Sequence, residues 1–402
     1  MRKRTLKLLL ILAFSVIPLI LAEQSFPAEK VPGVTDTTIR IGSAGSFSGP
    51  FFLIGYPQTH GLEMIYNKAN DEGGIHGRKI VFVAEDDGGI PAKALAAAKK
   101  LCTQDDVFLI HGFAGSNPAL AAKPEIERSG VPWLIMSATN DNLMKPFCRT
   151  IFTTALQASQ EGRMMADFAM SMPGVKRVAV VSQQDAWGRM KYEPCLQQLK
   201  EKYGVTPVAN EEVEPDISDA TPQVLKIMGA KPDVVLLIVY DRASFVILRD
   251  AYVKGLKVPF VGNSMQMDLY DMLKKVGNYD AIKNVYGCSF SKYPLDHPKM
   301  ENWVKLRKQY FPDDANIAFN YIACGGAQVI VEALKRAGRD LTREKWIEAM
   351  ESTKNFQTDF YPEPISFSPA DHIGNKAGSF CTFTKGKKVV HIGAKWVQVE
   401  KD

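Results

Sequence analysis

The sequence predicts an α/β protein with two lobes, each built on a doubly wound parallel sheet. Strands alternate with single helices between residues 37 and 154, and the same alternation restarts after Thr154. Such alternation is typical of right-handed βαβ units. The chain beyond its first 22 residues is about 380 residues long, which is more than one hydrophobic core usually serves. Periodicity and length together therefore predict two doubly wound domains.

The first 22 residues have the features of a secretory signal peptide. Four basic side chains lie within residues 2–7, and an apolar run covers residues 8–21. That run is shorter than the ~20 apolar residues that a membrane-spanning helix needs. The cleavage site is expected between residues 22 and 28, and the first cysteine, Cys102, is far from it. We therefore expect an exported, soluble, periplasmic protein without a lipid anchor.

The modest positive charge of the chain belongs to this leader. Residues 1–22 contain four positive charges and no negative one, so their removal lowers the formal net charge from +5 to +1. A nearly neutral protein lacks the electrostatic attraction that nucleic-acid binding requires. A hydrophobic content of 46% and a charged content of 23% are ordinary for a soluble globular protein. Nucleic acid is therefore excluded as a partner.

The first unit reads as four strands and three helices. Apolar residues at helical spacing and prolines in two first turns, Pro91 and Pro118, indicate where its helices lie. The expected strands are 37–45, 79–85, 108–112 and 131–139, and the expected helices are 58–70, 91–102 and 116–130.

The second unit repeats this order. Residues 232–240 form a continuous apolar run, which is typical of a parallel strand covered on both faces. The other expected strands are 177–183, 205–213 and 258–262, and the expected helices are 160–170, 187–203, 221–229 and 244–254. The last third of the chain predicts helices at 298–310 and 317–337, then short strands near 363–368, 378–384 and 388–399.

Polar loops follow six of these strands. In open parallel sheets, ligands bind beyond the carboxyl ends of the strands. The loops there are rich in hydroxyl and amide side chains, and the second also begins a helix, whose N-terminus suits an anion. They are residues 45–56, 112–118, 137–142, 183–189, 240–244 and 262–266. Any one of these residues could simply cap a helix, but six polar loops together predict a binding crevice.

Motifs for catalysis are absent from the sequence. The segment GSFSG has Phe47 where a nucleophile elbow requires serine. No phosphate-binding loop occurs, and no two histidines are spaced as in a helical zinc site. The six cysteines include no C-x-x-C pair; they are compatible either with disulfides or with buried free thiols. We therefore expect a protein that is not an enzyme and uses no metal or cofactor.

An ordered set of motifs resembles one known family. It begins with the Ser48-Gly49-Pro50 turn, Gly55, the GGIHG turn at 73–77, and the Asp86-Asp87 end of the second strand. It continues through IHGFAGS, VPWLIMSAT, RVAVVSQQDAWGR, PDVVLLIVY, VPFVG and PISFSPADHIGNKAG. Together these segments resemble the periplasmic leucine/isoleucine/valine-binding proteins of ABC importers, over essentially the whole chain after the leader.

The resemblance implies a type I periplasmic binding fold with a hinge that the chain crosses three times. It places one lobe at 35–154 plus 291–367 and the other at 155–290 plus 368–402. It also implies a monomer that closes on a small ligand and delivers it to an ABC permease in the inner membrane. A periplasmic sensor that passes ligand status to a receptor is the alternative.

The resemblance also assigns ligand-binding positions. In such proteins one lobe holds the ligand carboxylate through hydroxyls and backbone amides, and aromatic side chains of the other lobe cover it. The positions that match the carboxylate site are Gly115 or Ser116, Ser137, Ala138 and Thr139. The aromatic positions of the second lobe match Trp187 and Tyr240. The aromatic position of the first loop falls on Ile54, with Phe51 and Phe52 beside it.

One position departs from the family pattern. The acidic residue that branched-chain amino-acid binders use for the ligand ammonium falls on Ser264. A buried ammonium without a carboxylate costs about 2–5 kcal/mol. Asp241 is the first candidate replacement, and Asp185, which could equally cap a helix, is the second. The expected ligand is therefore an amino acid or an aromatic or aliphatic carboxylic acid.

Overall fold

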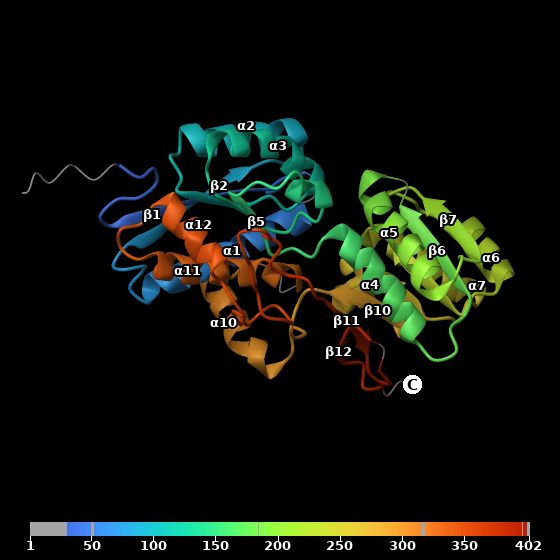
Figure 1. The fold of residues 1–402 in the computed structure, drawn as a ribbon. Coiled ribbons are helices and arrows are strands. Elements are labelled where there is room, and N and C mark those ends of the chain that lie inside the picture. The colour runs from blue at the N-terminus through green and yellow to red at the C-terminus, as the bar shows by residue number, and fades with distance from the viewer. Residues whose placement is uncertain (1–29, 50–51, 184, 315–317, 396, 400–402) are drawn as a thin grey trace, which may run out of the picture. The chain divides into compact units, whose positions relative to one another are not determined.

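The computed structural model describes residues 30–49, 52–183, 185–314, 318–395 and 397–399. The predicted signal peptide and Phe51 lie outside the described residues. Within the described part, two β-sheets each carry helices on both faces (Figure 1). This is the α/β architecture that the alternation of strands and helices predicts.

The first sheet has five strands in the order β2-β1-β3-β4-β5. Every neighbouring pair in it is parallel. Its strands are β1 (Thr38–Gly45), β2 (Lys79–Asp86), β3 (Leu109–Gly112), β4 (Trp133–Ile135) and β5 (Ile151–Thr153).

Helices cover both faces of this sheet. Helices α2 (Pro91–Thr103) and α3 (Ser116–Ser129) lie side by side over one face and bury alanine-rich surfaces against it (Figure 1). Helices α1 (Phe52–Asp71), α11 (Cys324–Ala337) and α12 (Arg343–Glu351) pack on the other face, around the buried Trp346. Since both faces are buried, the strands carry apolar side chains in both directions.

The second sheet has seven strands in the order β12-β11-β10-β9-β8-β6-β7. Strands β6 to β10 pair in parallel, and β11 and β12 add to one edge in antiparallel fashion. The strands are β6 (Val178–Gln183), β7 (Ala209–Val213), β8 (Val234–Ile238), β9 (Phe260–Gly262), β10 (Val285–Ser289), β11 (Ser379–Phe383) and β12 (Val389–Ile392).

Two groups of helices enclose this sheet. Helices α4 (Ala158–Ser171) and α5 (Ala186–Tyr203) bury one face, and α6 (Thr221–Ala230), α7 (Asp241–Lys254) and α8 (Leu269–Val276) bury the other. The remaining helices are short or peripheral: α9 (Tyr279–Ile282), α10 (Glu301–Tyr310), and the 3-10 turns η1 (Asp141–Met144), η2 (Ser264–Gln266), η3 (Pro298–Met300) and η4 (Ala318–Tyr321).

The chain passes between the two sheets three times. It leaves the first sheet after β5, returns to the first unit after β10, and joins the second sheet again at β11. Two of these segments run together, because Thr153 donates its N–H to the carbonyl of His372 at 3.0 Å and accepts from Gly374 at 2.8 Å. Among the described helices, none combines the length and apolar character needed to cross a membrane.

The structure corrects some predicted boundaries. Helix α1 begins at Phe52, whereas the sequence pattern places its start after Pro57 because proline disfavours a helix interior. The rings of Phe52 and Tyr56 stack one helical turn apart with centroids 5.0 Å apart, which supports the turn ahead of the proline. Residues 363–368 contribute two isolated bridges, from Ile365 to Phe356 and from Ser368 to Asp371, rather than a strand.

Candidate functional site

A cavity lies among the loops that follow the strands of both sheets. It encloses about 900 Å³ of empty space, part of which is open to solvent. A volume of this size fits a small organic ligand. Eight of the residues predicted from the sequence line it: Ile54, Gly115, Ser116, Ser137, Thr139, Trp187, Tyr240 and Ser264. The prediction that these loops converge on one crevice agrees with this arrangement.

The polar side of the cavity combines a helix N-terminus with hydroxyl groups. Ser116 is the first residue of α3, and its predecessor Gly115 is extended, with φ of −91°. The first N–H groups of an α-helix have no partner within the helix and favour an anion. Ser137 donates its hydroxyl to Gln58 at 2.5 Å, so the hydroxyls of Ser116 and Thr139 are better placed to serve a ligand.

The aromatic side of the cavity comes from segments that follow strands β6 and β8 of the second sheet. The rings of Trp187 and Tyr240 are stacked, with centroids 4.1 Å apart and an angle of 15° between their planes. Burial, together with the negative charges of Asp185 and Asp241, raises the pKa of Tyr240 above its usual value. Tyr240 is therefore a neutral phenol at physiological pH. Asp185 caps α5 by accepting the N–H of Gly188 at 2.7 Å, which is the helix-capping role that the sequence left open.

Three predicted residues do not line the cavity. Ala138 is 1% exposed and packs in the core under α2 and α3. Phe52 is 39% exposed and stacks on Tyr56. Asp241 begins α7, where its carboxylate accepts the N–H of Arg242 at 2.8 Å. A direct role for these three in ligand binding stays a prediction.

A buried ion pair beside the cavity was not predicted from the sequence. Lys191 lines the cavity but is only 1% exposed, and Glu161 beside it is fully buried. The Lys191 Nζ lies 3.2 Å from a Glu161 carboxylate oxygen, 4.2 Å from the centroid of the Trp187 ring, and 3.5 Å from the Thr139 hydroxyl. The one available signal was the spacing of Lys191 four residues after Trp187, which puts both on one helix face.

Glu161 also fixes the loop that contains Ser264. It accepts the backbone N–H of Ser264 at 2.5 Å. Helix α4, which contains Glu161, and helix α5, which contains Lys191, approach closely at Gly162. Only glycine fits there, because a Cβ would lie 2.1 Å from the carbonyl oxygen of Lys191. The close approach of α4 and α5 thus places the carboxylate next to the ammonium. Ser264, expected at the ligand site, lines the cavity and is held there through its backbone N–H by Glu161.

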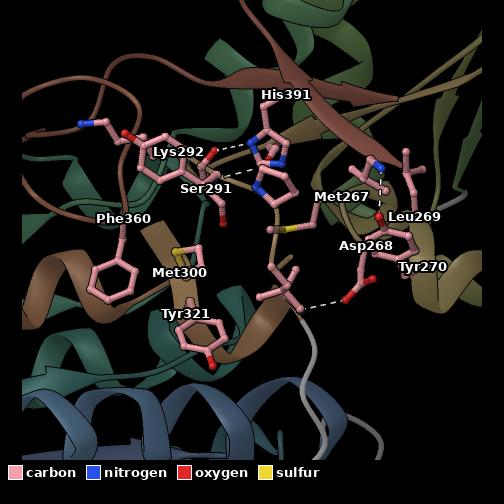
Figure 2. A pocket seen from close by; sticks show the side chains of 16 residues that line it. Met267, Asp268, Leu269, Tyr270, Ser291, Lys292, Met300, Tyr321, Phe360 and His391 are labelled. Carbon is pink, nitrogen blue, oxygen red and sulfur yellow. Dashed lines mark hydrogen bonds between the residues drawn. The ribbon is translucent and has the colours of Figure 1, made fainter. Parts of the chain in front are cut away.

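A second hollow lies between β10, β12 and η4, and several polar groups around it form hydrogen bonds within the protein (Figure 2). Its half-buried carboxylate, Asp268, accepts the N–H groups of Ala318 at 2.7 Å and Asp271 at 3.0 Å. Burial lowers the pKa of His391 to about 4, so this neutral ring donates from Nδ1 to the carbonyl of Ser291 at 2.8 Å. These groups serve the structure, and the first cavity remains the candidate site.

The described residues contain no group of three or more His, Cys, Asp or Glu side chains that could hold a metal ion. The six cysteines are free thiols. Of the two readings left open for them, the structure therefore agrees with free thiols.

Comparisons with known proteins agree with this geometry. A family model described as "Periplasmic binding protein" matches residues 38–388. The Leu/Ile/Val-binding protein homolog 7 of Brucella abortus is 27% identical over 330 residues, which are 79% of this chain and 81% of the relative.

Solved structures show the same fold. The branched-chain amino acid transporter substrate binding protein of Streptococcus pneumoniae, in complex with isoleucine, has a TM-score of 0.75 at 22% identity and covers 88% of this chain and 100% of its own. A fatty acid ABC transporter substrate-binding protein from Thermomonospora curvata has a TM-score of 0.76 at 22% identity, covering 91% and 94%. The fold is thus shared by a protein in complex with isoleucine and by a fatty acid transporter substrate-binding protein.

Proposed function

Because the chain belongs to the periplasmic binding protein family, whose members are substrate-binding proteins of transporters and not enzymes, we propose that it binds a small organic carboxylate for an ABC importer. The observation that carries this proposal is a cavity of about 900 Å³ that loops from both sheets line together. The ligand is an amino acid or an aromatic or aliphatic carboxylic acid. The protein works in the periplasm as a monomer and passes its ligand to an inner-membrane permease.

The proposed mechanism is closure about the three segments that connect the sheets. The lobes would be 35–154 plus 291–367 and 155–290 plus 368–402. Ligand would bind the hydroxyls and the α3 N-terminus of the first lobe, and closure would bring Trp187 and Tyr240 over it. The hydrogen bonds between Thr153 and residues 372 and 374 support this hinge, since they hold two of the crossings together.

A thermal-shift screen tests the proposed function. The protein without residues 1–22 is heated with amino acids, aromatic acids, aliphatic acids and dicarboxylic acids, each alone. A ligand that binds only the folded state raises the melting temperature. We expect at least one carboxylate to do so without being chemically altered. Turnover of the bound compound, lost on mutation of a cavity residue, would contradict the assignment to a binding protein.

We predict that Ser116→Ala and Thr139→Ala each weaken ligand binding by about 1–3 kcal/mol, the range for hydrogen bonds to a charged group. Isothermal titration calorimetry with the ligand from the screen measures the change. Thr103→Ala is the matched control. The Thr103 hydroxyl donates a hydrogen bond to the carbonyl of Lys99 at the end of α2, and Thr103 does not line the cavity. Unchanged affinity in both cavity variants would mean that the carboxylate site lies elsewhere.

Asp241→Asn is expected to change the affinity by less than about 0.5 kcal/mol, as a substitution away from the contacts does. The reason is that Asp241 does not line the cavity in the described structure. A loss of about 2 kcal/mol or more would instead identify Asp241 as the partner of a ligand ammonium. The same calorimetric titration distinguishes these results.

A further inference from the structure

We propose that the cavity is built for a carboxylate that lacks an ammonium group, and that Lys191 binds that carboxylate. This inference rests on the proposed function, because it names the ligand class of the same site. It begins from the charges that face the cavity. Among the described residues that line it, Lys191 is the one cation, and none is an aspartate or a glutamate.

The carboxylate beside this cation, that of Glu161, already has partners within the protein. Glu161 is fully buried, lies 3.2 Å from Lys191 Nζ and accepts the N–H of Ser264 at 2.5 Å. It does not line the cavity. Glu161 therefore neutralises the ammonium of Lys191 and not that of a ligand. The ammonium of an amino-acid ligand would meet Lys191, a like charge, and would have no acidic side chain to pair with.

Lys191 retains the capacity to bind an anion. A lysine ammonium has three N–H donors. Its two polar partners among the described residues are Glu161 and, at the long distance of 3.5 Å, the Thr139 hydroxyl. A ligand carboxylate beside Thr139 would supply the remaining partner, so that the lysine would bridge two carboxylates. The Trp187 ring, whose centroid is 4.2 Å from the ammonium, adds a cation–π contact that helps to hold Lys191 beside the cavity.

Much of the remaining lining is apolar and suits the carbon skeleton of a ligand. Ile54, Met265, Phe290 and Ile322 line the cavity together with the stacked rings of Trp187 and Tyr240. Burial of aliphatic or aromatic carbon against these side chains supplies affinity. The ligand class is therefore an aliphatic or aromatic carboxylic acid without an α-amino group.

Calorimetry with matched pairs of compounds tests this inference. The pairs are 4-methylpentanoate with leucine, and 3-phenylpropionate with phenylalanine; the members of each pair differ only in the ammonium. We expect the acid of at least one pair to bind about 30-fold or more tightly than its amino acid, the penalty for an unpaired buried charge. Tighter binding of the amino acids would overturn the inference and leave the proposed function standing. No binding by any acid or amino acid, here and in the screen, would overturn both.

A double variant tests the role of Lys191. Lys191→Met alone would leave Glu161 buried without a counter-ion and could unfold the protein, so it is combined with Glu161→Gln. We expect the double variant to fold, as circular dichroism reports, and to bind 3-phenylpropionate about 30-fold or more weakly. It should also lose the preference for 3-phenylpropionate over the neutral 3-phenylpropanamide.

Lys123→Met is the matched control. Lys123 is also a buried lysine, but its ammonium donates to the carbonyls of Asn142 and Lys145, away from the cavity lining. Its replacement should leave both the affinity for 3-phenylpropionate and the preference over the amide unchanged. A folded double variant that keeps the wild-type affinity and preference would contradict the assignment of Lys191.

Discussion

Gly162→Ala is expected to lower the free energy of unfolding by about 1–3 kcal/mol, the cost of overpacking a close contact. A Cβ at this position would lie 2.1 Å from the carbonyl oxygen of Lys191 and 3.2 Å from its Cα. Both are backbone atoms, so no side chain can turn away, and α4 and α5 must move apart. Because Glu161 and Lys191 face each other across this contact, ligand affinity should fall as well.

Urea unfolding followed by circular dichroism measures the stability, and calorimetry measures the affinity. Gly229→Ala is the control, since a Cβ on this α6 glycine meets no atom within 4 Å. Alanine in a helix is more favourable than glycine by roughly 0.5–1 kcal/mol, so the control should be slightly stabilised. Wild-type stability in Gly162→Ala would show that the two helices do not depend on this close approach.

Trp187→Ala should weaken ligand binding by about 2–4 kcal/mol, in the range found for buried aromatic anchors. The change removes the ring stacked on Tyr240 at 4.1 Å and the surface beneath the Lys191 ammonium at 4.2 Å. It therefore removes both an apolar wall of the cavity and a support for its cation. Calorimetric titration with the ligand from the screen gives the change in affinity.

Trp303→Ala separates an effect on the site from a general loss of packing. This tryptophan is on α10, where its ring lies 4.9 Å from the ring of Phe360, and it does not line the cavity. Its replacement should lower stability and leave affinity unchanged. Equal losses of affinity in the two variants would argue against a specific role for Trp187.

The sequence predicts the fold well where periodicity is strong. Apolar runs such as 232–240 and first-turn prolines such as Pro91 place strands and helices close to their observed positions. Strand β10 was missed because its five residues, including Gly287 and Cys288, have little β-branched character. Helix α12 was missed as well: its nine residues offer only a short periodic pattern, although Thr342 caps it.

The predicted site is incomplete for a different reason. Loops at the ends of parallel strands converge because of the topology, so Ser116, Thr139 and Tyr240 could be found from their positions along the chain. The pair formed by Glu161 and Lys191 depends on how two helices pack across Gly162. That contact joins residues 30 positions apart and has no periodic signature. Its charges are those of ordinary surface residues until packing buries them.

A crystal structure of the protein without its leader, bound to the tightest-binding acid from the screen, tests the central claim most directly. The account predicts ligand density in the cavity between α3 and α5, with a carboxylate oxygen at hydrogen-bonding distance from Lys191 Nζ and the Thr139 hydroxyl. The carbon chain should contact Trp187 and Tyr240. Density for the acid at another place, or a carboxylate directed away from Lys191, would contradict it.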